Sequence, residues 1–142
     1  MLQREMTATA DRLPAVRGLL AQLHRSLLDA ERRDLEKESG RVSSGEYLGL
    51  LLNDPRFQWL RPLGRMVARL DDVIAHAETS GDPITDLEAG LLLDEVGQVV
   101  NLRTGLEAGL RYIAWLQREP EVVLAHAALA SALKPRPTAW AA

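Results

Sequence analysis

The stretch that decides the fold runs from residue 53 to residue 77: Asn53-Asp-Pro-Arg-Phe-Gln-Trp-Leu-Arg-Pro-Leu-Gly-Arg-Met-Val-Ala-Arg-Leu-Asp-Asp-Val-Ile-Ala-His-Ala77. Asp54 followed by Pro55 predicts a helix start, because the carboxylate can cap free backbone N–H groups and proline is tolerated at the first helical position. Pro62 should bend or restart this helix, since it removes a backbone hydrogen bond and clashes with a preceding carbonyl. Apolar residues at intervals of three and four then predict one buried face: Leu60, Leu63, Val67, Leu70, Ile74 and Ala77.

A second apolar face precedes this stretch, in a long predicted helix that begins with Asp11 as its N-cap and ends at Gly40. Its members also step by three and four along the chain: Leu13, Val16, Leu20, Leu23, Leu27 and Ala30. Two amphipathic helices of this length each need a partner to cover the apolar side. We therefore expect the two faces to pack together.

Further helix starts are predicted by capping boxes, in which Ser or Thr is followed three residues later by Glu, at Ser43, Thr85 and Thr104. Pro120 predicts the start of a last helix. No segment alternates apolar and polar residues with the period of a strand. We predict an all-α, single-domain helical bundle of about four main helices plus one or two short ones, which covers residues 1–133. A flexible, proline-containing tail is expected at residues 134–142.

Composition limits the possible functions. The chain has 142 residues, enough for one domain with a real core, and its 46% hydrophobic and 26% charged residues are ordinary for a globular protein. A net charge of −3 argues against a nucleic-acid partner or an anionic membrane. The absence of cysteine excludes disulfides, thiolate metal sites and thiol catalysis. Without an apolar run of about 20 residues or a secretory signal, we expect a cytoplasmic protein.

The three histidines, His24, His76 and His126, are candidate metal ligands because each lies on a different predicted helix. Helical bundles build metal sites between facing helices, commonly from Glu-x-x-His pairs, and this sequence contains no such pair. A site that combines two histidines with Asp72 or Glu78 is the minor alternative. The favoured interpretation is three separate histidines at the edge of the core, with no metal and no cofactor.

Arg61, Arg65 and Arg69 form a basic stripe at i,i+4 spacing, in which like charges repel by a few tenths of a kcal/mol. We favour internal ion pairing or solvation of this stripe, for example pairing with the acidic end of the first helix at Asp29, Glu31 or Glu36. The alternative is that the stripe binds an anion or a partner.

Catalytic motifs were not found. Adjacent carboxylates such as Asp71 and Asp72 point about 100° apart on a helix, so they do not form an acid/base pair. No phosphate-binding glycine loop and no Ser-His-Asp arrangement can be identified. We therefore predict no catalytic residues and no enzymatic activity.

Three segments resemble a family of short bacterial proteins known only as uncharacterised. They are Leu23-His-Arg-Ser-Leu-Leu-Asp-Ala-Glu-Arg, Leu50-Leu-Leu-Asn-Asp-Pro-Arg-Phe-Gln-Trp-Leu-Arg-Pro-Leu and Val122-Val-Leu-Ala-His-Ala. The resemblance covers most of residues 16–133 and implies a helical protein of the bacterial cytoplasm. It implies no activity and no site residues.

The number of leucines on the first predicted helix suggests a function. The apolar flanks of the first helix are wider than one partner helix covers, and oligomers often bury such a surplus in two-fold interfaces. We predict a non-enzymatic protein–protein interaction module that self-associates as a homodimer or binds a protein partner. The alternative is a helical bundle that binds a small ligand, an anion or a metal.

Overall fold

The computed structural model describes residues 9–101 and 106–134. Within these ranges the chain forms seven helices and no strand: α2 (Leu13–Ser39), α3 (Ser44–Asn53), α4 (Pro55–Gln58), α5 (Arg61–Ser80), α6 (Asp86–Val100), α7 (Leu106–Arg118) and α8 (Pro120–Leu133). The predicted all-α, single-domain fold is confirmed, although the helix count is higher than predicted. The extra helix arises because the chain restarts before Pro62, which separates α4 from α5. The predicted cap at Thr104 and residues 135–142 of the predicted tail lie outside the described residues.

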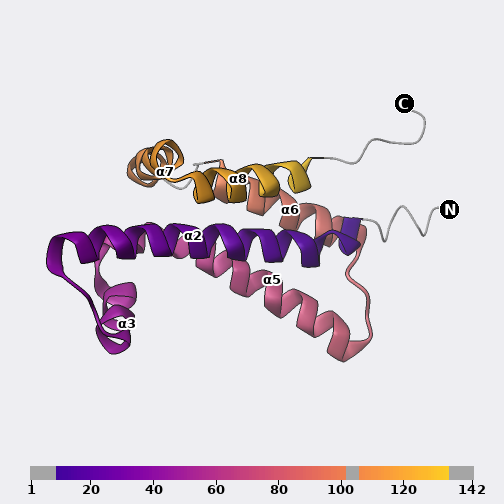
Figure 1. Cartoon of the computed structure of the whole chain (residues 1–142). Helices are drawn as coiled ribbons and strands as arrows, with labels where there is room; N and C mark the ends of the chain where they lie inside the picture. Colours follow the sequence, from indigo (N-terminus) through magenta and orange to yellow (C-terminus); the bar gives the residue numbers. More distant parts are fainter. Residues whose placement is uncertain (1–8, 102–105, 135–142) are drawn as a thin grey trace.

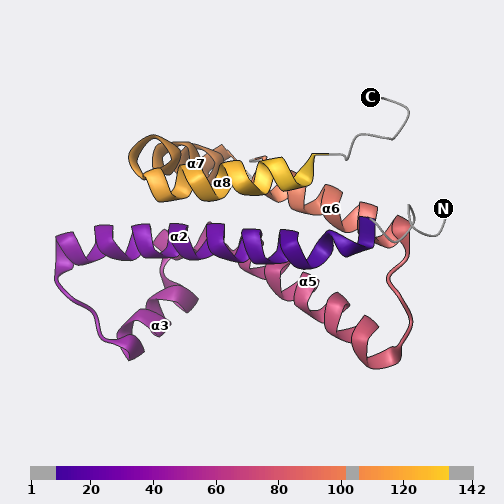
Figure 2. The ribbon, with the colours of Figure 1, turned by 45° about the vertical axis from the view of Figure 1, so that its right-hand side comes forward.

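The long helix α2 is the centre of the molecule. Helices α7 and α8 lie on one side of it, and α3 and α5 lie on the other, as both Figure 1 and Figure 2 show. α2 packs mainly against α8 and α5, which are far from each other in the sequence. The core therefore forms on two sides of one helix.

The predicted apolar face of α2 is buried from end to end. Each of its six predicted members is at most 1% exposed. The face of α5 is buried at Leu63, Met66 and Leu70, whereas Val67 and Ile74 are only partly covered. Leu129 of α8 and Val96 of α6 complete the opposite side of the core. Spacing of three and four residues thus identified the buried face of α2 completely and that of α5 only in part, because Ala77 is also partly covered and the buried Met66 lies outside the predicted series.

Side-chain caps define three helix starts as predicted. The Ser43 hydroxyl accepts a hydrogen bond from the Glu46 N–H at 3.2 Å, and the Thr85 hydroxyl accepts one from the Glu88 N–H at 3.1 Å. The Asp54 carboxylate accepts from the Arg56 N–H at 2.8 Å. These caps satisfy backbone N–H groups that the first turn of a helix leaves free.

The prediction that Asp11 caps α2 was wrong. Residue 11 is already helical, and Arg12 precedes α2 in a helical conformation without a side-chain cap. The Arg12 guanidinium instead donates hydrogen bonds to the carbonyl oxygens of Ala132, at 2.6 Å, and Lys134, at 3.0 Å. It thereby joins the start of α2 to the end of α8. At the other end, Gly40 terminates the helix at a φ of 82°, a value that favours glycine.

None of the described helices combines the length and the apolar character that a bilayer-spanning helix requires.

Candidate functional site

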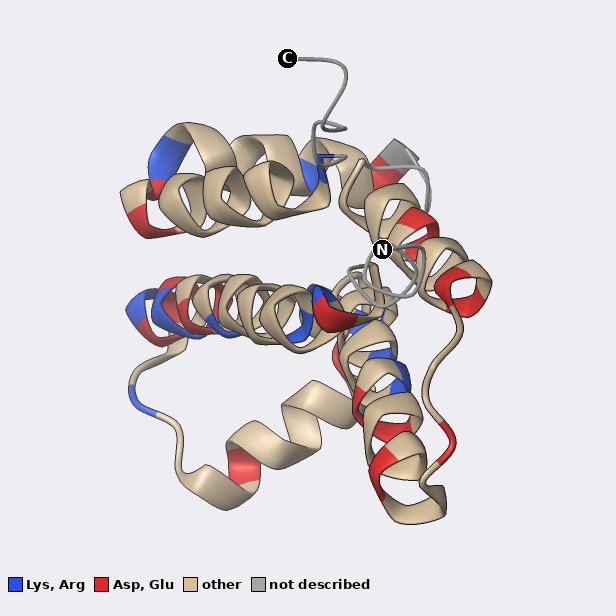
Figure 3. Ribbon diagram, turned by 90° about the vertical axis from the view of Figure 1, so that its right-hand side faces the viewer, with Lys and Arg blue, Asp and Glu red and all other residues tan. Residues whose placement is uncertain are grey.

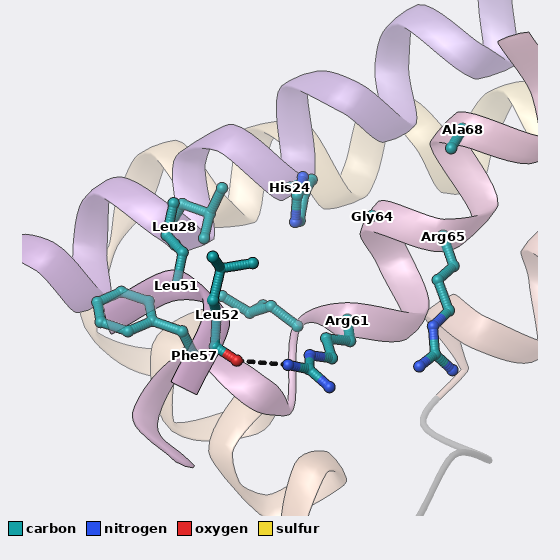
Figure 4. Close-up of a pocket in the computed structure, with 10 residues that line it drawn as sticks. His24, Leu28, Leu51, Leu52, Phe57, Arg61, Gly64, Arg65 and Ala68 are labelled. Carbon is teal, nitrogen blue, oxygen red and sulfur yellow. Dashed lines mark hydrogen bonds between the residues drawn. The ribbon is translucent and has the colours of Figure 1, made fainter. Parts of the chain in front are cut away.

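Helices α2, α3, α4 and α5 border an open groove of about 450 Å³, shown in Figure 4. His24 and Leu28 project into it from α2, and apolar side chains of α3 and α4 gather at one end. Arg61 and Arg65 of α5 lie toward the other end, where the Arg61 guanidinium turns back to the Leu52 carbonyl and the Arg65 side chain points away from His24. Its lining residues are His24, Leu28, Leu51, Leu52, Phe57, Leu60, Arg61, Gly64, Arg65 and Ala68.

The His24 ring lies against the backbone of α5 because residue 64 is glycine. A Cβ atom at Gly64 would lie 3.2 Å from Cε1 and 3.3 Å from Nε2 of His24, closer than ordinary contacts. Burial lowers the pKa of His24 below its usual 6.5, so the ring is neutral at pH 7. A neutral imidazole carries one N–H donor and one acceptor nitrogen. His24 therefore supplies a polar group to the groove without a charge.

The predicted basic stripe does not act as one unit. Arg69 pairs with Glu95 of α6 at 2.6 Å, and Arg61 donates a hydrogen bond to the Leu52 carbonyl oxygen at 2.5 Å. Arg65 has no ion pair within the described ranges. Internal pairing is thus confirmed for Arg69, but its partner lies on α6 and not on the acidic end of α2.

The three histidines occupy different surroundings. His24 lines the groove, His76 is exposed on α5, and His126 of α8 lies 2.6 Å from the Tyr112 hydroxyl through Nδ1. Across residues 9–101 and 106–134, no group of three or more His, Asp or Glu side chains is arranged to hold a metal ion. The metal-site alternative therefore has no support from these residues.

A buried carboxylate is the strongest polar feature of the molecule. Glu31 of α2 is 0% exposed, and four N–H groups surround its carboxylate. Oε2 accepts hydrogen bonds from the indole N–H groups of Trp59, at 2.8 Å, and Trp115, at 3.1 Å. Arg111 donates from Nε to Oε2 at 2.5 Å and from Nη2 to Oε1 at 2.7 Å. We call these four residues the Glu31 cluster.

The Glu31 cluster joins three separate parts of the chain. Trp59 lies between α4 and α5, while Arg111 and Trp115 are one turn apart on α7. The hydrogen bond to Glu31 is the main cause that raises the pKa of Arg111. Every oxygen of the buried carboxylate is satisfied, so the cluster presents no free group to a substrate. The cluster therefore holds α2, α7 and the connection between α4 and α5 together.

Sequence reasoning did not identify this cluster. From the sequence, Glu31 is expected only as one of the acidic residues of the first helix that could pair with the basic stripe. A signal was nevertheless present, because Glu31 follows Leu27 by four residues and so continues the apolar face of α2. Trp59 and Trp115 also need partners for their N–H groups when buried. A carboxylate on an apolar face is such a partner.

Tyr112 and His126 form a second polar pair between α7 and α8. Tyr112 is 2% exposed, its ring packs edge-on against His126, and burial raises the pKa of its phenol. Burial also lowers the pKa of His126. A neutral histidine can accept a hydrogen bond from the tyrosine hydroxyl at Nδ1, which satisfies the buried hydroxyl. This pair contributes to packing, and both polar groups already have partners.

Helix α3 is attached to the rest of the molecule on one side only. Tyr47 packs edge-on against Phe57 at 5.7 Å between ring centroids, and the Arg32 guanidinium lies 4.3 Å above the Tyr47 ring. On the opposite side Leu48 is 59% exposed and Leu52 is 58% exposed. No residue of α3 is buried, although half of its ten residues are large and apolar.

Comparisons with family models, with curated proteins and with solved structures found no match for this chain.

Proposed function

We propose that the protein is a non-enzymatic interaction module that forms a homodimer through α3. One observation carries the proposal: α3 has five large apolar side chains and buries none of them. Soluble helices normally turn such residues toward a core. An apolar helix that finds no core in its own chain is explained when a second chain covers it.

The outward side of α3 suits a copy of itself. Gly45, Leu48, Gly49 and Leu52 follow the i, i+3, i+4, i+7 spacing of a single helix face. A Cβ atom at either glycine would meet nothing within 4 Å, so a second helix has room to approach closely there. In a two-fold antiparallel pair, the leucines of one copy would lie beside the glycines of the other. The face is therefore complementary to itself, as an isologous interface requires.

Charge supports the same partner. Glu46 is the single charged residue of α3, and the helix is almost entirely tan in Figure 3. Two copies can therefore meet at this face with little repulsion, despite the net charge of −3. A helix of ten residues is about 15 Å long and covers less than the roughly 1,200 Å² of a stable interface. We expect a dimer that dissociates on dilution.

Sedimentation velocity over a hundredfold range of concentration tests the proposal. The wild-type protein should shift from monomer to dimer, and Leu48→Glu should remain a monomer while keeping its circular dichroism spectrum. Leu87→Glu is the matched control. Leu87 is 74% exposed on α6, so this substitution adds the same charge to the surface but away from α3. Equal dimerisation by Leu48→Glu and wild type, or a monomeric wild type at every concentration, would refute the proposal.

A further inference from the structure

The groove beside α3 has two chemically different ends. Leu28, Leu51 and Phe57 make one end apolar, and Arg61 and Arg65 make the other basic, as Figure 4 shows. Its volume of about 450 Å³ lies within the range of small-molecule sites, roughly 300–1,000 Å³. A ligand that fills such a groove needs an apolar body and an anionic head.

We propose that this groove binds a free long-chain carboxylate. The hydrocarbon chain would lie along the leucines and Phe57, and the carboxylate would lie beside α5, where Arg61 and Arg65 can turn their guanidinium groups toward it. The groove shares Leu52 with the proposed dimer face, whereas Leu48, the central residue of that face, does not line the groove, so a change at Leu48 tests the dimer apart from this site.

The donors at the basic end are available for a carboxylate. Arg65 has no ion pair within the described ranges, and Arg61 uses one Nη2 hydrogen bond to Leu52, which leaves other N–H donors on its guanidinium. His24 is neutral and can donate one ring N–H. None of the described lining residues is Asp or Glu. The groove therefore offers positive charge that no neighbouring acidic lining residue neutralises.

Gly64 leaves room for the His24 ring beside α5. Any side chain at this position would push the His24 ring, which lies 3.2 Å from the place of a Cβ atom. Glycine in a helix interior costs about 1 kcal/mol of stability relative to alanine, and at this position the absent side chain leaves room for the His24 ring.

Other ligand classes fit the groove less well. A phosphate ion would use the arginines but leave the apolar end unfilled. A metal ion would find one histidine and no carboxylate among the lining residues. A neutral apolar compound would not use the arginines. Only an anionic amphiphile contacts both ends.

Calorimetric titration of the full chain with saturated carboxylates of increasing length tests the apolar end. Each methylene buried should increase affinity by up to about fourfold until the groove is filled, after which affinity should level off. Dodecanoate should bind more tightly than dodecanol, and dodecyltrimethylammonium should bind most weakly. Equal affinities for the carboxylate and the cationic amphiphile would overturn the proposal.

Two variants test the basic end and the position of the site. Arg65→Met should weaken dodecanoate binding about fivefold without changing dodecanol binding, because only the ion pair is lost. The control Arg25→Met removes an exposed arginine that lines no part of the groove and should change neither affinity. Ala68→Trp places a large side chain at an exposed position in the groove and should weaken both ligands. If Ala68→Trp leaves both affinities unchanged, the ligand binds elsewhere and the proposal fails.

A last arm separates a free carboxylate from a membrane lipid. Free dodecanoate should bind while the protein does not co-sediment with phosphatidylglycerol vesicles. Co-sedimentation without dodecanoate binding would overturn the assignment of a free carboxylate. Leu48→Glu should bind dodecanoate as the wild type does, so failure of the homodimer and failure of this site give different results.

Discussion

Replacing Glu31 by glutamine should lower the free energy of unfolding by about 3 kcal/mol. The change keeps the size of the side chain and one carbonyl oxygen but introduces an NH₂ group. If the oxygen takes the position of Oε2, it still faces the N–H groups of Trp59, Trp115 and Arg111 Nε. The new NH₂ then faces Arg111 Nη2, where the carboxylate oxygen accepted a hydrogen bond at 2.7 Å. The hydrogen bond from Arg111 Nη2 is thus lost, and two N–H donors face each other in its place.

The magnitude follows from the number and kind of these hydrogen bonds. A hydrogen bond to a charged group contributes about 1.5–3 kcal/mol, and one between neutral groups about 0.5–1.5 kcal/mol. The combined cost of losing one hydrogen bond and weakening three others should therefore be close to the 3–5 kcal/mol measured when buried ion pairs are broken. The side chain of Arg111 is 39% exposed and can recover water, which places the expectation at the lower limit. This is a large share of the roughly 5–15 kcal/mol that stabilises a typical protein.

Urea unfolding followed by far-UV circular dichroism measures this loss without relying on tryptophan fluorescence, which the substitution itself should change. In thermal unfolding, the same loss of 3 kcal/mol should lower Tm by about 10 °C, given 142 residues and an unfolding entropy of about 2.1 cal/mol/K per residue. The matched control is Glu38→Gln, because Glu38 pairs with Arg56 at 2.8 Å but is 63% exposed. That surface pair should contribute less than about 1 kcal/mol.

The reasoning is refuted if Glu31→Gln and Glu38→Gln destabilise the protein equally. A double-mutant cycle provides a second criterion. Trp115→Phe should destabilise the wild type by about 1–2 kcal/mol and should have a smaller effect when residue 31 is already glutamine, because both changes affect the same hydrogen bond. Strict additivity would show that the indole does not stabilise the protein through the carboxylate.

Three further predictions test other parts of the structure. Burial lowers the pKa of His126 in the folded protein below 6.5, so on acidification the unfolded chain takes up its proton first. The contribution of His126 to the free energy of unfolding should therefore be fully present above about pH 6.5 and be lost as the pH falls further. Urea titrations at several pH values should show a smaller loss of stability on acidification for His126→Gln than for the control His76→Gln, because His76 is exposed. Gly81→Ala should lower stability by about 1–2 kcal/mol in thermal unfolding, because its φ is 78°, whereas the unobstructed helical Gly18→Ala should raise Tm. Asp54→Ala should cost about 1 kcal/mol in urea unfolding through loss of the α4 cap, and an unchanged midpoint would contradict that role.

The helices were largely predictable from sequence because their signals are local. The Ser43 and Thr85 caps depend on residues three positions apart, and the restart at Pro62 depends on its own ring and missing N–H. The buried face of α2 follows from spacing alone, as Leu20 and Leu27 illustrate. The start of α2 was missed because the preceding residues are themselves helical, so Asp11 never adopts the extended conformation of a cap.

The candidate sites were harder to predict because they depend on contacts between distant residues. Glu31 and Arg111 are 80 residues apart, so the spacing that places Glu31 on the apolar face of α2 does not identify the partner of its carboxylate. The groove likewise requires α3, α4 and the start of α5 to lie beside the same part of α2, which helical periodicity does not specify. Arg65 and Arg69 look equivalent in sequence, yet only Arg69 lies within reach of Glu95. Pairing depends on where α6 lies, and that is a property of the tertiary fold.

The segment between α3 and α5 connects stability with the proposed binding surface. Trp59 donates its hydrogen bond to Glu31, while Phe57 and Leu60 on either side of it line the groove. Phe57 and Leu60 are 2% and 1% exposed, so the segment has little freedom to shift. Loosening Trp59 must therefore also loosen one wall of the groove. The stretch that decides the fold thus has two roles: the Glu31 cluster holds it in place, and its other side chains form the surface on which Arg61 and Arg65 can meet a ligand.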